Sequence, residues 1–443
     1  MSSVTLKNIS PFAQLAALIV VLSFFVRCTP LNQETESKTS SRNLLNSSST
    51  FIYNMIPSNA AADISSGYAA AINAFSVNLL DKIYTGNSYL GKNVVVSPFC
   101  ASLNLAIITE ATTGTSQTEL LGVLGGRPAL DDARPALCKL LYADNSVILQ
   151  IADAVWVDSA KYSLLPSFRD TANTKYGVQA TGLNFGNVQG SVAAINQWIA
   201  NNTANLVTNV VDESYITPLT ALLITSTIYF KADWTSPFDV TQTAPHPFST
   251  PAGTVDVSMM TSNYQHKTRK TADYENVRLY YGTNAENFFY LDVYMPESIS
   301  VEEFIGQKCL AALANQDSMG YGGLRMPKFF FENLIDLKPV LQNMGVNGAF
   351  DPNAGEITGM AFDKSARDNA HLHIERIVQK AGIQTDEEGT VAYAVTVSGL
   401  SAGNCAPVSP DVVLDRPFVY FIRAGATGLV LFAGVVNNPN EKN

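Results

Sequence analysis

The sequence predicts an α+β fold, because helical and strand-like patterns are segregated along the chain and do not alternate. Apolar residues recur at helical spacing in "AAAINAFSVNLLDKIY", which begins at Ala69, whereas the second half carries strand-like runs such as "FFYLDVYMP" and "GGLRMPKFFFEN". Regular alternation of strands with helices would instead predict a doubly wound parallel sheet. The chain has 443 residues, 47% of them hydrophobic, enough for a sizeable core in one large domain or two smaller ones.

The amino-terminal segment predicts a secretory signal peptide over residues 1–28. Lys7 precedes the apolar run "PFAQLAALIVVLSFFV", from Pro11 to Val26, which is too short to span a membrane comfortably. A signal anchor is the alternative interpretation. We therefore expect a secreted, extracellular protein.

Residues 29–65 predict a flexible amino-terminal extension. The segment "NQETESKTSSRNLLNSSST" is rich in Ser, Thr and Asn and has no apolar periodicity. It contains a sequon at Asn46, and a second sequon begins at Asn201. Both asparagines are candidate glycosylation sites in a host that glycosylates secreted proteins.

Charge and cysteine content exclude several classes of function. The formal net charge is -10 and no run of Lys or Arg stands out, so we expect neither a nucleic-acid partner nor a heparin-binding helix. The five cysteines are scattered through a long chain, which favours free thiols over a disulfide scaffold. Cys405 is interpreted as a loop thiol, since no base accompanies it to make it a nucleophile. No cofactor is expected.

Four segments predict the central elements. The stretch "NVVVSPFCASLNLAIITEAT" starts as a strand at Asn93, turns at Ser97, and becomes a helix apolar nearly all round, which should be buried. The runs Leu149 to Asp158 and Leu219 to Trp234 read as strands buried on both faces, and Gly190 to Val207 reads as an exposed amphipathic helix.

Neither a catalytic nor a metal centre is predicted. His371 and His373 are two residues apart on a predicted strand, but no cluster of Cys or carboxylates accompanies them. A hydrolase would need a triad, and the residues of that kind that lie close in sequence are Asp363, Ser365, Asp368 and His371. Triad members usually come from separate elements, so we expect that the protein is not an enzyme.

The segment "QTDEEGTVAYAVTVSGLSAGNCAP", which begins at Gln384, has an unusual face. Taken as a strand after Gly389, it alternates between two sets of side chains. One set is small throughout, consisting of Thr390, Ala392, Ala394, Thr396 and Ser398, and the other consists of Val391, Tyr393, Val395 and Val397. The chain beyond Ser398 is an exposed, cleavable loop by composition. A strand able to enter a tight space beside a cleavable loop suggests stored strain that cleavage releases; an ordinary hairpin arm is the alternative.

The stretch "DEEGTVAYAVT" resembles the hinge of the serpin family. The similarity extends through "VVVSPFCASLNLAII", "INQWIANNTANLV", "TSTIYFKADWTSPFD", "VSMMTSNY", "LRMPKFFFENLIDLKPVLQNMGVNGAFDPNAGEITGM" and "LDRPFVYFIRAGATGLVLFAGVVNNP", in family order, over roughly Ala69 to Pro439. The resemblance implies one serpin domain over residues 66–439, with three β-sheets, about nine helices and an exposed reactive-centre loop at about 387–412. It also implies a suicide substrate: a target serine protease is acylated at the loop and trapped as the hinge inserts into the central sheet.

The resemblance assigns roles to individual residues. The hinge positions are Glu387, Glu388, Gly389, Thr390, Ala392, Ala394 and Thr396. Trp234, with Lys231 beside it, matches the place where insertion begins, and the polar positions beneath the opening sheet are Asn93, Ser97, Ser226 and Gln379. Cys100, Ser226 and Gln379 depart from the residues common in the family, which implies a differently wired polar network. Gly389 is expected to be a flexible pivot.

The family spacing from Gly389 places the reactive bond between Gly403 and Asn404, with Ala402 and Leu400 as alternatives for the residue before it. No Lys or Arg occurs between Glu388 and Arg416, so we expect elastase-like or subtilisin-like target proteases. A chymotrypsin-like or an asparagine-specific cysteine protease is the alternative target. A non-inhibitory serpin, a carrier or chaperone, is the alternative function. The protein is expected to be a monomer that forms a covalent acyl complex with its target.

Overall fold

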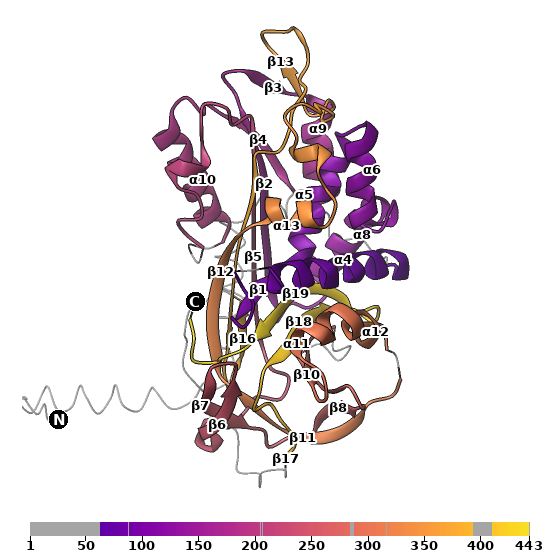
Figure 1. Cartoon of the computed structure of the whole chain (residues 1–443), viewed down its shortest axis with the longest axis vertical. Helices are drawn as coiled ribbons and strands as arrows, with labels where there is room; N and C mark the ends of the chain where they lie inside the picture. Colours follow the sequence, from indigo (N-terminus) through magenta and orange to yellow (C-terminus); the bar gives the residue numbers. More distant parts are fainter. Residues whose placement is uncertain are drawn as a thin grey trace, which may run out of the picture. The chain divides into compact units, whose positions relative to one another are not determined.

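The computed structural model describes residues 63–86, 88–203, 205, 207–283, 288–315, 317–392 and 410–442. The expected signal peptide, nearly all of the expected extension and the sequon at Asn46 lie outside these residues. The described residues form three β-sheets and 9 helices, counting α11 and α12 as one continuous run (Figure 1). The predicted α+β fold is therefore confirmed.

The helices concentrate in the first half of the chain, as the sequence predicts. They are α4 (Ser66–Tyr84), α5 (Pro98–Glu110), α6 (Gly114–Val123), α7 (Pro128–Asp131), α8 (Ala133–Tyr142), α9 (Pro166–Thr171) with a π-helical continuation (Ala172–Tyr176), α10 (Val188–Asn202), α11 (Val301–Glu303) continuing through a π turn (Phe304–Lys308) into α12 (Cys309–Ala314), and α13 (Leu337–Asn343). Short 3-10 turns lie at Glu213–Tyr215, Val240–Gln242 and Gly348–Phe350. Within the described part, no helix is long and apolar enough to cross a membrane.

The central sheet has six strands. In spatial order they are β12 (Phe329–Asp336), β15 (Arg376–Thr385), β16 (Gly389–Ala392), β5 (Leu222–Asp233), β2 (Ile148–Asp158) and β4 (Gln179–Leu183). β2 and β5 are buried along nearly their whole length, as their continuous apolar runs predict.

The other two sheets lie beside it. The ten-stranded sheet runs in the order β1 (Val94–Val96), β19 (Leu429–Val436), β18 (Phe418–Ala424), β10 (Phe289–Pro296), β9 (Tyr274–Tyr280), β8 (His266–Lys270), β11 (Gly320–Pro327), β7 (Gly253–Thr261) and β6 (Ala244–Thr250), with β17 (Pro410–Val413) paired to β11. The three-stranded sheet is β14 (Asp368–Asn369), β13 (Ala361–Asp363) and β3 (Tyr162–Leu164).

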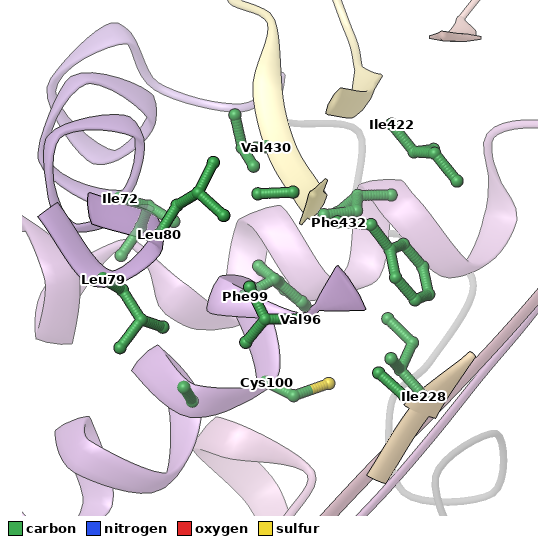
Figure 2. Packing of buried hydrophobic residues seen from close by; sticks show 14 of the residues in the cluster. Ile72, Leu79, Leu80, Val96, Phe99, Cys100, Ile228, Ile422, Val430 and Phe432 are labelled. Atoms are coloured by element: carbon green, nitrogen blue, oxygen red, sulfur yellow. The ribbon is translucent and has the colours of Figure 1, made fainter. Parts of the chain in front are cut away.

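Helix α5 packs against one face of the central sheet and is buried from Pro98 to Thr109, as its apolar pattern predicts. Its start is fixed by Ser97, whose hydroxyl accepts a hydrogen bond from the backbone N–H of Cys100. Figure 2 shows Phe99 and Cys100 of α5 beside Val96 of β1, with Cys100 directed toward Ile228 of β5. The main core therefore lies between α5 and the sheets.

Helix α10 covers the opposite face of the central sheet, where a second core forms around Trp156 and Tyr229. Its buried side chains include Ile195 and Ile199, while most of its other residues are at least partly exposed, as expected for an amphipathic helix. Along β5, the even-numbered apolar residues belong to the α5 core, whereas Leu223 and Tyr229 belong to the α10 core. This alternation directs the apolar side chains of β5 to the two cores in turn.

Candidate functional site: the open end of the central sheet

The central sheet is closed at one end and forked at the other. β15 and β5 pair directly, in parallel, over Arg376 to Lys380 and Leu223 to Thr227. Beyond this last pair they separate, and β16 lies between them, antiparallel to both. The fork, defined here as the point beyond Lys380 and Thr227 where the two strands part, opens toward the end of the sheet that carries the hinge (Figure 1).

The described part of the hinge already occupies the mouth of the fork. Gly389 pairs with Asp233 of β5, and the pairing continues in register to Ala392, which lies opposite Phe230. On the other side Thr390 pairs with Thr385 of β15. Four hinge residues are thus paired in the sheet of the uncleaved chain.

Gly389 is required by close packing. A Cβ at this position would lie 2.2 Å from the backbone oxygen of Ala232 and 2.7 Å from Cα of Asp233. The turn that precedes it is closed by Asp386, whose carboxylate accepts hydrogen bonds from the N–H groups of Glu388, at 3.1 Å, and Gly389, at 3.3 Å. Gly389 therefore lets the hinge backbone approach β5 closely. The sequence predicted only a flexible pivot at this position and did not predict the close approach.

Thr390 is the most deeply held hinge residue. Its side chain is fully buried, and its hydroxyl accepts a hydrogen bond from the hydroxyl of Tyr281 at 2.6 Å. The ring of Tyr281 stacks on Trp234, with the ring centroids 4.6 Å apart. Trp234 also holds the turn that precedes the hinge. Its indole N–H donates to the backbone oxygen of Asp386 at 2.9 Å, and its backbone N–H donates to the backbone oxygen of Glu388 at 2.8 Å.

Glu387 anchors the start of the hinge. Its carboxylate accepts hydrogen bonds from Lys328 Nζ and Thr243 Oγ1, both at 2.7 Å, and its backbone oxygen accepts from the N–H of Phe238. Burial alone would raise the pKa of Glu387, but these donors outweigh it and hold the pKa below its ordinary value. Glu388, the next residue, is exposed, and Lys231 of β5 is only partly buried opposite Val391.

A polar cluster lies beneath the last closed pairs of the sheet. Gln379 of β15 is opposite Ser226 of β5 and donates to its hydroxyl at 3.3 Å. The amide of Gln379 also accepts from the backbone N–H of Ser97 at 2.7 Å and donates to its backbone oxygen at 2.9 Å. This side chain therefore links the two strands of the fork to the start of α5.

Sequence reasoning missed Asp153, which belongs to the same cluster. Asp153 lies on β2 directly opposite Ser226, is only 1% exposed, and faces α5 together with Cys100. The signal was present, since an acid interrupts the otherwise buried strand pattern "LQIADAVWVD". An acidic residue inside a strand buried on both faces is a candidate functional residue.

Other predicted residues lie elsewhere. Asn93 does not join the cluster beneath the sheet; its side chain binds the carboxy-terminal segment, with its amide donating to the backbone oxygen of Asn438 at 2.7 Å. Asn201 is exposed near the end of α10. The sequon residue Thr203 is fully buried, and its hydroxyl donates to the backbone oxygen of Ile199.

The residues considered for a metal or a triad do not assemble into either. His371 and His373 precede β15, which begins at Arg376, so the strand placement predicted for them is wrong. His371 is bound to the backbone oxygen of Gly355, while Asp363 accepts from the backbone N–H of Ser365. Asp368 accepts from the backbone N–H of its neighbour. Among the residues that the structure describes, no group of three or more His, Cys, Asp and Glu could hold a metal ion.

The predicted reactive bond lies in the undescribed segment 393–409. The predicted site residues that fall there are Ala394, Thr396, Leu400, Ala402, Gly403, Asn404 and Cys405. The structure thus shows the part of the hinge from Glu387 to Ala392 and the sheet that receives it.

Comparison with known proteins identifies the family of the chain that carries this fork. Residues 70–439 match the family model "Serpin (serine protease inhibitor)". An uncharacterized serpin-like protein of Thermococcus kodakarensis is 31% identical, covering 84% of this chain and 85% of its own, and Serpin-Z10 of Arabidopsis thaliana is 28% identical, covering 79% and 93%. The structure of Arabidopsis AtSerpin1 in its native stressed conformation superposes with a TM-score of 0.74 at 24% identity, over 86% of this chain and 100% of that one. Members of the family are generally protease inhibitors that interact with target proteases and are not enzymes. The chain belongs to the serpin family.

Proposed function

We propose that this serpin is a secreted inhibitor that traps a serine protease by loop cleavage and insertion into the central sheet. One observation carries the proposal: the fork is open, and Gly389 to Ala392 already lie within it in the register that further insertion would follow.

The register of the described pairs supports the proposal, because it can be extended to the residues that would insert next. If the pairing of Thr390 with Ala232 is extended, Ala394 comes opposite Ile228 of β5, on the buried α5 face, where close packing favours a small side chain. Tyr393 comes opposite Tyr229 of β5 and, by the pairing with β15, opposite Gly382, on the α10 face. The absence of a side chain at Gly382 offers space for the one bulky residue of this segment.

The energy released is sufficient for a trap. Each newly paired residue adds backbone hydrogen bonds worth roughly 0.5–1.5 kcal/mol net, so about a dozen residues release on the order of 10 kcal/mol. Ordinary proteases are stable by a similar margin, so this free energy is enough to distort one that is tethered to the loop.

The covalent step occurs at the loop. The serine oxygen of the protease attacks the carbonyl carbon of Gly403, the peptide bond to Asn404 breaks, and the serine proton leaves with the new amine of Asn404. Insertion of the hinge then carries the acyl-enzyme away before water can hydrolyse the ester. Small residues around this bond favour elastase-like or subtilisin-like proteases.

The test is incubation of the protein with pancreatic elastase, subtilisin, chymotrypsin and trypsin. We expect complexes that survive SDS with the first two enzymes, and a released carboxy-terminal peptide that begins at Asn404. Cleavage without a complex, together with no gain in thermal stability after cleavage, would show a non-inhibitory serpin.

Secretion is tested separately. The full chain, expressed in a host with a secretory pathway, is expected in the medium with a new amino terminus near Cys28, as the apolar run before it predicts. Retention of the intact chain in the membrane fraction would instead favour the signal anchor.

A further inference from the structure

Asp153 is a buried acid at the point where the sheet must open. It lies on β2, and the hydrogen-bonded order across the sheet at this level is Asp153, Ser226 and Gln379. Only the pair of Lys380 with Thr227 separates this level from the fork. Neither carboxylate oxygen of Asp153 accepts a hydrogen bond of ordinary geometry from a described residue. An unpartnered carboxylate inside a protein is costly and calls for an explanation.

The groups that face Asp153 offer little compensation. Cys100 and Asn104 approach it from α5, and Ser226 and the backbone of Thr227 approach it from β5. Of these only Cys100 titrates, and burial holds the pKa of its thiol well above the ordinary value, so it stays neutral. The side-chain oxygen of Asn104 is itself buried without a partner. No positive charge among these groups balances an ionised Asp153.

Burial therefore raises the pKa of Asp153 to about 7, and the nearby Ser226 and Cys100 lower it by less than burial raises it. Between the ordinary carboxyl pKa and about 7, the closed sheet keeps a proton that the opened sheet releases, so the closed sheet loses stability as the pH rises through this range and loses no more above it. Anything that lets water reach the carboxylate relieves this cost.

Insertion acts on this same level. The pairing of Gly389 with Asp233 and of Thr390 with Thr385, continued along both strands, brings Thr396 opposite Ser226 on one side and opposite Gln379 on the other. Thr396 would then replace the direct hydrogen bond between Gln379 and Ser226. β5 and β15 must therefore separate before Ser226, the neighbour of Asp153 on β5, can pair with Thr396.

We propose that Asp153 gates the opening of the central sheet through its charge: the ionised side chain promotes separation of β5 from β15, and the neutral side chain keeps them together. This rests on the proposed inhibitory function for its biological meaning, although the gate itself is a property of the sheet. Asp153 touches no protease and is a positioning residue. The structure thus predicts faster insertion at neutral and mildly alkaline pH than at mildly acidic pH.

The test measures sheet opening without a protease. A synthetic peptide with the sequence of residues 390–403 is added to the full chain, and its incorporation is followed by native gel mobility and tryptophan fluorescence between pH 6 and pH 8. If the pKa of Asp153 returns to its ordinary value as the strands part, incorporation should be about tenfold faster at pH 8 than at pH 6. Asp153→Asn, which cannot ionise in either state, should incorporate the peptide at a rate that does not change with pH and that is slower than the wild-type rate at both pH 6 and pH 8.

A matched control is Asp336→Asn. Asp336 of β12 also has a pKa raised by burial, but its partner Arg376 lies on β15, and the two neighbouring strands should move together during opening. This variant should keep the wild-type pH profile. If Asp153→Asn folds poorly, Asp153→Ser replaces it, with the same flat profile expected.

The outcomes distinguish the gate from the inhibitory function. A wild-type profile retained in both Asp153 variants, a flat profile in the wild type, or no incorporation at any pH would overturn the gate. A tenfold rise in the incorporation rate between pH 6 and pH 8 that is lost in Asp153→Asn would support the role of Asp153. If the same protein forms no complex with any protease, that result would contradict the proposed inhibitory function alone.

Discussion

Lys328 and Glu387 form an ion pair that ties the hinge to the rest of the molecule. Nζ of Lys328 lies 2.7 Å from Oε2 of Glu387, and Lys328 is the residue that joins β11 to β12. The side chain of Glu387 is 7% exposed, whereas that of Lys328 is 39% exposed. The pair therefore connects the turn before the hinge to the junction between two of the three sheets.

Removing the charge of Glu387 should loosen the hinge. Glu387→Gln is expected to lower the free energy of unfolding by about 1–2 kcal/mol at pH 7.5, a value discounted because Lys328 is partly exposed. Because the pKa of Glu387 is lowered in the folded state, its contribution is present above the ordinary glutamate pKa and is lost as the pH falls through the folded value. Urea titrations at pH 7.5 and pH 3.5 measure this. A double-mutant cycle with Lys328→Met that gives no coupling would contradict it.

A charge at Thr390 should abolish inhibition and preserve cleavage. Thr390 is fully buried and hydrogen-bonded to Tyr281, so Thr390→Arg cannot keep the hinge in the fork without burying an unpaired charge. We expect at least a tenfold rise in the number of inhibitor molecules consumed per protease trapped, and no rise in melting temperature after loop cleavage. Thr390→Ser, which retains the hydroxyl, should behave as the wild type. Equal trapping by the arginine variant would exclude insertion as the mechanism.

The residue at position 403 should set the class of target. Gly403→Arg places a basic side chain before the predicted reactive bond, and trypsin should then form an SDS-stable complex that the wild type does not form. The second-order rate constant for elastase should fall by at least tenfold. Sequencing of the released peptide provides the check, because a start at any residue other than Asn404 would move the reactive bond.

His266 should make the protein sensitive to acid. It is buried beside Phe238, whose backbone N–H binds Glu387, and burial lowers the pKa of His266 to about 4. The unfolded chain takes up the proton first, so stability falls as the pH drops from about 6.5 toward 4, by about 2 kcal/mol at pH 5. Thermal melts of His266→Phe should show a smaller loss between pH 7 and pH 5 than the wild type. His246→Gln, at a more accessible histidine, should leave the wild-type loss intact.

The sequence predicts the fold well because its decisive signals are local. The apolar pattern of α5, the continuous apolar runs of β2 and β5, and the amphipathic α10 each specify how much of the element is buried. Hinge residues could be identified through the family pattern, including the small face that begins with Thr390.

Contacts between distant segments could not be predicted in this way. Asn93 is close in sequence to Ser97, yet it binds Asn438, some 345 positions away, because the carboxy-terminal segment returns beside β1. Asp153 looked like part of an apolar strand, and only the pairing of β2 with β5 shows that it faces Ser226. The need for glycine at position 389 likewise arises from the nearness of β5, which no local pattern encodes.

The partial occupancy of the fork has a kinetic consequence. Strand addition normally begins with a slow nucleation step, in which several residues lose their freedom before any gain. In the proposed mechanism Gly389 to Ala392 have already passed that step, so insertion after loop cleavage would extend an existing strand and would not have to nucleate one. If the chain traps a protease as proposed, the competition between trapping and hydrolysis of the acyl-enzyme depends on how fast β5 and β15 separate ahead of the inserting chain.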